Sequence, residues 1–336
     1  MNPTLQTFAG SLLQDNNILV ASYDLESLPL CTRNAMHLKA LHRPGVYNYA
    51  LQPFSLDCRR VKRLCIINGM GVTLGDSIIG IAALHAIKAI NPHIHLTVLR
   101  PGTCQPYVED IYRLAGKIID ELHYLPAALS TFKGYDALID AGNQLFRNDF
   151  ATQEMHDFFL RHLGIDPDSV PADIKTNRWL SEGMPEQDPV LNMPYVLLNH
   201  RASTPLRNIP HGILAEFVEH IYQRHKMPVA GFGRINHPHF IDLSSHSQTT
   251  QNFITIIRYA RRLYTCDSSA LHIAAAFGVP TICYFNAIKP SLRAAYYPRC
   301  ESLDMGTERS ERLHQSEDHA LLSEIENNYR RYLALA

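Results

Sequence analysis

The sequence predicts an α/β protein built from two domains, each with a parallel, doubly wound sheet. Residues 63–99 have the pattern of a strand, a glycine-rich loop, a helix and a second strand, which together form a βαβ unit. After a proline-containing stretch at 176–194 with little periodicity, apolar runs and helical patterns alternate a second time. A chain of 336 residues is long enough for two domains of ordinary size.

The expected elements follow in order from these patterns. The opening sixty residues are poorly patterned, and a helix closes the chain. We expect domains at 61–180 and 195–336, with 1–60 as an extension and 176–194 as the linker. The first domain is expected to have strands at 63–67, 95–99, 118–119 and 137–140 and helices at 77–90 and 154–163. The second is expected to have strands at 195–199, 228–232, 263–266 and 281–285 and helices at 212–225, 252–260, 269–277 and 320–333.

The composition is that of an ordinary globular protein, with 46% hydrophobic and 19% charged residues. A formal charge of -1 gives no overall field that would attract nucleic acid or an anionic membrane, so any anion site must be local. The seven cysteines form no C-x-x-C pair, and the N-terminus has no basic region followed by an apolar one. The apolar stretch 270–285 is too short to span a bilayer. These features predict a cytoplasmic protein.

The loop after the first strand contains Gly69, Gly71 and Gly75 and ends with Asp76 at the start of a helix. Its spacing is close to the dinucleotide fingerprint, but the third glycine is one residue late. The next strand ends at Arg100, so a nicotinamide site would have to bind the phosphorylated cofactor, NADP. A turn that only permits close packing is the other alternative. Asp76 favours a ligand site, because this position faces the crevice at the carboxyl ends of the strands.

Two further loops carry polar residues in the second domain. The run 267–280 begins with an aspartate and two serines between a strand and a helix, where free amides and the helix dipole suit a diphosphate. Simple capping of the helix is the alternative. The run 200–210 carries two arginines and two hydroxyls that could clamp a phosphate, or it could be a solvated loop. The pattern His237-Pro238-His239 with His246 lacks further ligands at metal spacing, so we expect no metal.

These three segments together resemble glycosyltransferase family 9, whose best-known members are the ADP-heptose:lipopolysaccharide heptosyltransferases. The match consists of Gly75-Asp76 with its apolar helix, the strand 135–140, the run 207–210, and Asp267-Ser268-Ser269-Ala270-Leu271-His272 leading to Gly278-Val279-Pro280. It covers residues 61–336. Three positions depart from the family pattern: Ser269 replaces a glycine, Arg207 a lysine and Ile209 a tryptophan.

The resemblance implies the glycosyltransferase B fold, in which two Rossmann-like domains face a cleft. It implies an inverting enzyme without metal or cofactor that transfers heptose from ADP-heptose to a hydroxyl acceptor such as the lipopolysaccharide inner core. Asp76 would be the general base, ionised at neutral pH. The implied donor-binding residues are Ser203, Arg207, Asp267, Ser268, Ser269, Ala270, Leu271 and His272. The implied acceptor-side residues are Gly75, Asp140, Asn143 and Arg147.

Other functions stay open at this point. The acceptor could be a protein, in which case residues 1–60 would be an interaction segment with apolar contact points at 28–30 and 47–54. The protein could bind a sugar nucleotide without catalysis, or it could be an NADP-dependent oxidoreductase. The partners implied are a nucleotide-sugar donor and a glycolipid or protein acceptor, with peripheral membrane association and without nucleic acid. The sequence does not identify the acceptor, the exact donor sugar and nucleotide, or the oligomeric state.

Overall fold

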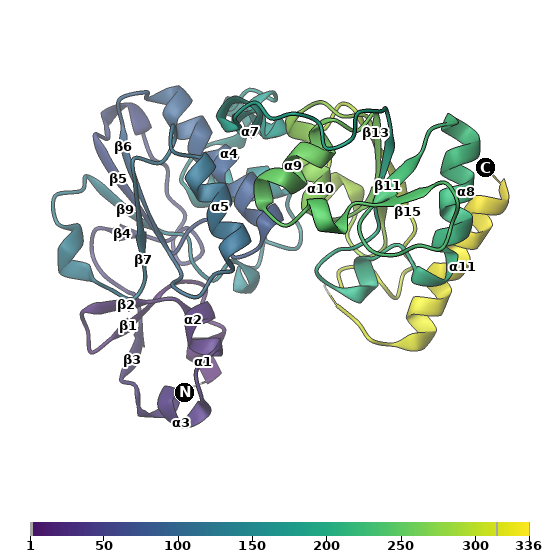
Figure 1. Cartoon of the computed structure of the whole chain (residues 1–336). Coiled ribbons are helices and arrows are strands. Elements are labelled where there is room, and N and C mark those ends of the chain that lie inside the picture. The colour runs from purple at the N-terminus through teal and green to yellow at the C-terminus, as the bar shows by residue number, and fades with distance from the viewer. Residues whose placement is uncertain (1–2, 314, 336) are drawn as a thin grey trace. The chain divides into compact units, whose positions relative to one another are not determined.

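The structure is a computed structural model that describes residues 3–313 and 315–335. The chain divides into two compact units, unit 1 with residues 1–175 and unit 2 with residues 176–336. Each unit is built around its own parallel sheet (Figure 1). The first sixty residues are part of unit 1, and residues 176–194 are part of unit 2.

Unit 1 contains a five-stranded parallel sheet with the order β4-β9-β5-β6-β7. The central strand has four consecutive buried residues, as expected where helices or loops cover both faces of a parallel sheet. The strands are β4 (Val46–Tyr47), β5 (Arg63–Ile67), β6 (His95–Arg100), β7 (Glu121–Tyr124) and β9 (Ala137–Asp140). The strand predicted at 118–119 is wrong. Ile118 and Ile119 are buried, but their N–H groups bond to the carbonyl of Ala115 and close the turn after a helix.

Three helices of unit 1 pack together, with α4 (Leu74–Ile90) in contact with both α5 (Pro106–Leu114) and α6 (Met155–His162). The N-cap residue of α4 is Thr73, whose hydroxyl accepts a hydrogen bond from the N–H of Asp76. Ten of its 17 residues are buried, which accounts for its nearly continuous apolar sequence. α5 was missed in the sequence, although proline at its first position is a common start signal.

The N-terminal residues form a small lobe on unit 1, drawn in purple in Figure 1. Its four-stranded antiparallel sheet has the order β3-β1-β2-β8 and consists of β1 (Leu12–Gln14), β2 (Ile18–Val20), β3 (Leu38–Ala40) and β8 (Ala127–Ala128). The short helices α1 (Pro3–Gln6), α2 (Ser22–Glu26) and α3 (Leu30–Ala35) complete the lobe. Because β8 comes from the middle of unit 1 and pairs with β2, the sheet of the lobe includes a strand from the rest of that unit.

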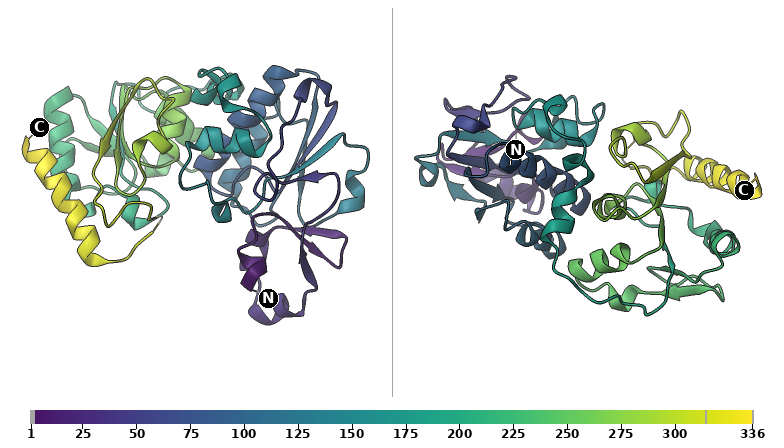
Figure 2. Two further views of the ribbon diagram at one scale, coloured as in Figure 1. Left: turned by 180° about the vertical axis from the view of Figure 1, so that it is seen from behind. Right: turned by 90° about the horizontal axis from the view of Figure 1, so that it is seen from above.

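Unit 2 contains a six-stranded parallel sheet with the order β12-β11-β10-β13-β14-β15. α8 (Leu214–His225) and α11 (His319–Leu335) pack on one face, and α9 (Thr250–Arg258) and α10 (Ser269–Ala276) lie on the other (Figures 1 and 2). α7 (Arg178–Gly183) lies against α10, within the stretch predicted as a linker. The strands are β10 (Val196–Asn199), β11 (Val229–Gly231), β12 (Phe240–Asp242), β13 (Arg262–Cys266), β14 (Thr281–Phe285) and β15 (Cys300–Asp304).

None of the helices in the described part of the chain combines the length and the apolar character that crossing a membrane requires.

Candidate functional site

Each parallel sheet has one point at which the chain direction along the sheet reverses. In unit 1 the chain runs outward from β5 to β7 and then returns to the other side of β5 with β9. In unit 2 it runs from β10 to β12 and then returns to the other side of β10 with β13. Loops at the carboxyl ends of the strands diverge at such a switch point and leave a crevice for ligands. The predicted functional residues lie at these ends of the sheets. Asp140 is the last residue of β9, and the others lie in the loops that follow β5, β9, β10 and β13 or in the helices that begin from those loops.

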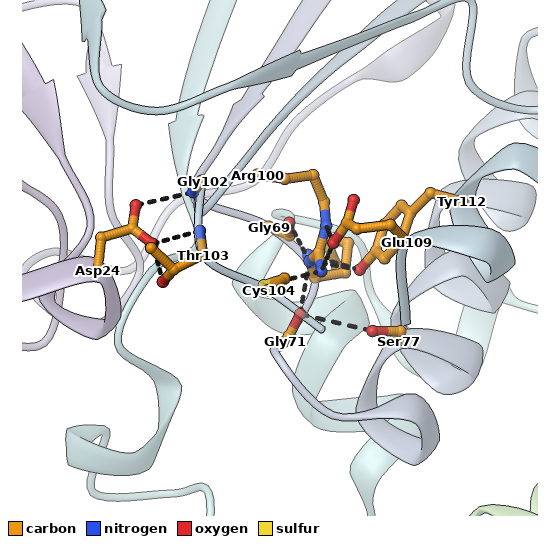
Figure 3. A network of polar contacts seen from close by, with 11 residues as sticks. Asp24, Gly69, Gly71, Ser77, Arg100, Gly102, Thr103, Cys104, Glu109 and Tyr112 are labelled. Atoms are coloured by element: carbon orange, nitrogen blue, oxygen red, sulfur yellow. Dashed lines mark hydrogen bonds and ion pairs between the residues drawn. The ribbon is translucent and has the colours of Figure 1, made fainter. Parts of the chain in front are cut away.

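The glycine-rich loop of unit 1 is held by a buried arginine, Arg100, at the end of β6 (Figure 3). Its guanidinium donates to the carbonyls of Gly69, at 2.9 Å, and of Gly71. It also forms an ion pair with Glu109, at 2.7 Å, and lies 3.7 Å over the ring of Tyr112. The φ of Gly71 is +94°, a value that other residues rarely adopt, and a Cβ there would lie 2.5 Å from that of Asp76. The loop is therefore a rigid turn that fixes where α4 begins.

The placement of Arg100 argues against the NADP alternative. Its side chain is 0% exposed, and Glu109 and the loop carbonyls use its donors, so no donor faces a cofactor phosphate. A ribose phosphate site needs an accessible cation at this position. The basic residue at the end of the second strand is thus a structural part of the loop.

Asp76 lies in the first turn of α4 and is partly exposed. Its carboxylate accepts a hydrogen bond of 3.1 Å from the side-chain amide of Gln144, which lies in the loop after β9. Gln144 is buried. The two loops of the unit 1 switch point therefore meet at this carboxylate. The sequence analysis missed Gln144; the signal was a polar side chain four residues after the strand that ends at Asp140.

The other predicted acceptor-side residues stabilise the loop after β9. Asp140 is fully buried and accepts hydrogen bonds from the N–H and hydroxyl of Ser11, at 2.8 and 2.7 Å, and from Asn48. Asn143 donates its amide to the carbonyls of Phe8 and Gln6 in the N-terminal lobe. These two side chains hold the lobe against the loop, and direct contact of either with an acceptor stays a prediction. Gly75 lies in α4 next to Asp76.

Arg147 is also buried and lies inside the same loop. It donates to the carbonyls of Asp140 and Gly142 and contacts the imidazole of His162. His162 in turn contacts the carboxylate of Asp149, at 2.9 Å. Burial lowers the pKa of Arg147 to about 10, and burial also lowers the pKa of His162. Arg147 thus keeps its charge at neutral pH, and the loop is wound around it.

In unit 2 the switch point brings Arg207 and Asp267 together, at 3.3 Å. Arg207 follows β10 and also donates to the hydroxyl of Ser203, at 2.7 Å. Asp267 follows β13 and is 3% exposed. The Nε atom of Arg207 is buried and has no hydrogen-bond partner among the described residues. Asp267 and Ser203 therefore hold the guanidinium of Arg207 in a fixed position at the switch point, and one of its donors has no partner among the described residues.

Ser268 and Ser269 lie at the start of α10. Ser268 is the N-cap residue in an extended conformation, and its hydroxyl bonds to Asn199, at 3.0 Å, and to Thr265 rather than to the helix. No cap hydrogen bond from this side chain occupies the first amides of α10. A helix N-terminus of this kind can bind an anion. The sequence analysis missed Asn199, a polar residue at the end of a buried strand.

The remaining predicted donor residues lie deeper. Ala270 and Leu271 are 0% exposed, and the N–H of Leu271 donates to the carbonyl of Ser268, so contact of either residue with a donor stays a prediction. His272 is buried, and its Nδ1 lies 2.8 Å from the hydroxyl of Tyr297, which also accepts a hydrogen bond from Asn177. Its carbonyl accepts from the same Asn177. His272 therefore connects α10 to Tyr297 and Asn177. Contact of its side chain with the donor stays a prediction.

The histidines singled out as metal candidates have other partners. His237 contacts Glu219, at 3.0 Å, and His239 stacks on Tyr222 with the ring centroids 3.4 Å apart. In residues 3–313 and 315–335, no group of three histidine, cysteine, aspartate or glutamate side chains is arranged to hold a metal ion. Metal independence stays a prediction about the reaction.

His200, in the loop after β10, is a further residue that the sequence analysis did not single out. It is buried, and burial together with the nearby Arg201 and His211 lowers its pKa to about 4. The imidazole is therefore neutral at pH 7. The cations of this loop at that pH are Arg201 and Arg207.

Comparison with known proteins gives a fold. No protein-family model and no curated protein sequence matches the chain. The glycosyl transferase family 9 structure from Veillonella parvula DSM 2008 is similar with a TM-score of 0.52 and 14% identity, over 84% of this chain and 99% of that chain. The Escherichia coli heptosyltransferase WaaC with ADP is similar with a TM-score of 0.51 and 14% identity, over 79% and 99%.

The iron-containing dodecameric glycosyltransferase TibC from enterotoxigenic E. coli H10407 is similar with a TM-score of 0.53 and 13% identity, over 84% of this chain and 80% of that chain. These likenesses extend across both units. The chain therefore has the α/β fold of the glycosyltransferase B class, with two Rossmann-like units, as the sequence predicted.

Proposed function

We propose that the protein is a glycosyltransferase that transfers heptose from ADP-heptose to a hydroxyl acceptor, with inversion and without a metal ion. The proposal depends on which side chains lie at the two switch points. One presents a carboxylate at the start of α4, and the other presents a fixed arginine beside the first turn of α10. Transfer from a nucleotide sugar needs both, a base for the acceptor and a cationic or dipolar site for the leaving diphosphate.

In the proposed reaction, Asp76 takes the proton from the acceptor hydroxyl. The acceptor oxygen forms a bond to the anomeric carbon while the bond from that carbon to the diphosphate breaks, and ADP leaves with the bonding electrons. The amides at the start of α10 and the guanidinium of Arg207 stabilise the charge that develops on the diphosphate. Ser203 lies within hydrogen-bond distance of Arg207 and belongs to the same proposed phosphate site.

The donor assignment is supported by what the similar structures contain. WaaC is described with ADP, and TibC is described in complex with ADP-D-beta-D-heptose. The acceptor we propose is a hydroxyl of the lipopolysaccharide inner core, and a protein hydroxyl is the alternative. We also propose that the protein acts in the cytoplasm, at the membrane surface when the acceptor is a glycolipid.

Thermal denaturation in the presence of a panel of nucleotide sugars tests the donor. A ligand that binds the native state raises the apparent stability in proportion to the logarithm of its concentration over Kd. We expect ADP and ADP-heptose to raise Tm, and UDP- and GDP-sugars at the same concentration to raise it less. An equal response to all nucleotides, or none to ADP, would contradict the donor assignment.

The contribution of Arg207 is tested by calorimetry with two ligands. We expect Arg207→Ala to weaken binding of ADP by about 1.5–3 kcal/mol, the range for hydrogen bonds to charged groups, and to weaken binding of adenosine much less. Arg224→Ala is the matched control and should change neither affinity, because Arg224 is exposed and lies in the last turn of α8. Equal losses for ADP and adenosine would place Arg207 away from the phosphates.

Metal independence has its own test. Because arginine and helix amides take the place of a cation in the proposal, we expect turnover to be unchanged after dialysis against EDTA. Loss of turnover that magnesium or manganese restores would refute this part of the mechanism.

A further inference from the structure

Gln144 donates a hydrogen bond from its side-chain amide to the carboxylate of Asp76. The amide Nε2 of Gln144 lies 3.1 Å from Oδ2 of Asp76. A side-chain amide that donates to a carboxylate fixes the direction of one oxygen and favours the ionised form. A general base needs both properties, since it must be unprotonated and aimed at the proton that it removes.

Gln144 cannot easily turn away from this position. It begins the short 3-10 helix Gln144–Phe146 and is 7% exposed. On its other side lies the glycine-rich loop, where a Cβ added to Gly71 would come within 3.3 Å of the same Nε2 atom. The amide is therefore confined between the two loops of the switch point.

The segment that carries Gln144, residues 140–149, is itself anchored at several points. Asp140 is bonded to Ser11 at the start of the segment, and Arg147 bonds to the carbonyls of Asp140 and Gly142 inside it. At the end of the segment, the side chain of Arg147 contacts His162, which in turn contacts Asp149. The buried charges of this segment thus determine where the Gln144 amide lies.

We infer that Gln144 is the positioning residue of the base, and that residues 140–149 are wound around Arg147 in order to present its amide to Asp76. The inference rests on the proposed function of Asp76 as the base. On this inference the buried residues of the segment fix the position of Gln144. Arg147 therefore affects Asp76 through Gln144 and does not contact the acceptor. In this account neither Gln144 nor the contacts of Arg147, His162 and Asp149 involve the substrate directly.

The first test is a titration that does not depend on activity. The side-chain carboxyl carbons of aspartate are labelled with ¹³C, and the signal of Asp76 is identified by its loss in Asp76→Asn. Gln144→Met keeps the side-chain volume and removes the donor. We expect it to raise the pH at which Asp76 takes up its proton by about one unit or more. Gln144→Glu is expected to raise it further, because a like charge replaces the donor.

Gln14 provides the matched control, because it donates to Asp15 in an exposed pair of the same unit. Gln14→Met should leave the titration of Asp76 unchanged. An unchanged midpoint for Asp76 in folded Gln144→Met and Gln144→Glu would overturn the inference. This result would stand whether or not the protein transfers sugar.

The second test uses hydrolysis of ADP-heptose, with water as the acceptor. We expect Gln144→Met to lower kcat by about 10–100-fold, as misplacement of a catalytic group does, while the Kd for ADP is unchanged. A fall in ADP affinity with kcat unchanged would show a merely structural role. The titration decides the role of Gln144 even if the wild-type protein does not use water as an acceptor.

Discussion

Asp76→Asn is expected to lower turnover of ADP-heptose by about 10²–10⁴-fold and to leave binding of ADP nearly unchanged. The substitution keeps the size of the side chain and removes its ability to accept a proton. The N–H of residue 76 still donates to the hydroxyl of Thr73, so the start of α4 is preserved. Donor binding is assigned to residues of unit 2, so it should not depend on this side chain. Steady-state kinetics and calorimetry with ADP measure the two quantities separately.

Asp15→Asn is the matched control, since Asp15 lies in unit 1 and its side chain is exposed. It should change neither kcat nor the affinity for ADP. Near wild-type turnover by Asp76→Asn would contradict the assignment of the base. A loss of ADP affinity equal to the loss of turnover would instead show that Asp76 acts on the donor.

Arg100→Met is expected to lower the free energy of unfolding of unit 1 by about 3–5 kcal/mol, the cost of removing one partner of a buried ion pair. The substitution leaves Glu109 buried without its cation and removes the donor that Arg100 supplies to the carbonyls of Gly69 and Gly71. Arg100 is 0% exposed, so water cannot easily replace these bonds. Urea denaturation followed by circular dichroism gives the change.

The matched control lies on α5, the helix that carries Glu109. Arg113 and Asp110 of α5 form an exposed pair, and Arg113→Met should cost no more than about 1 kcal/mol. A similar small loss for Arg100→Met would mean that the guanidinium network contributes little to the shape of the glycine-rich loop. A large loss would confirm that Arg100 supports the loop from within the protein.

A second set of contacts supports the same region from the N-terminal lobe. Asp24 accepts hydrogen bonds from the N–H groups of Gly102 and Thr103 and from the hydroxyl of Thr103, all at 2.7–2.9 Å (Figure 3). These residues follow β6 directly after Arg100. Together with the bonds from Ser11 to Asp140, they attach the lobe to the carboxyl ends of two strands of the sheet. The extension therefore belongs to the edge of the sheet that carries the candidate site.

The long buried strands and helices were predictable because apolar periodicity survives in the sequence. β5, β13 and α10 are buried at most of their positions and α4 at ten of its 17, and each was found within a few residues of its observed bounds. The strands β1, β2 and β3 have three residues each, too few to show a period. Their sheet depends on contacts with distant residues, such as those of β2 with β8.

The sequence predicted individual residues of the candidate site but not the contacts between them. The sequence identified Asp76, Arg207 and Asp267 because each follows a strand and precedes a helix or a turn. The contact of Gln144 with Asp76 depends on the order of the strands, which places β9 beside β5, and no local pattern reveals that order. Arg100 shows the same limit, because its burial depends on Glu109 and on the path of the loop above it.

The measurement that tests the central claim most directly is ¹H NMR of ADP-D-beta-D-heptose incubated with the purified protein and with Asp76→Asn. We predict that the wild-type protein releases ADP and that the heptose first appears as the α anomer, the product of inversion, while Asp76→Asn releases neither at a comparable rate. Release of the β anomer first would contradict inversion with Asp76 as the base.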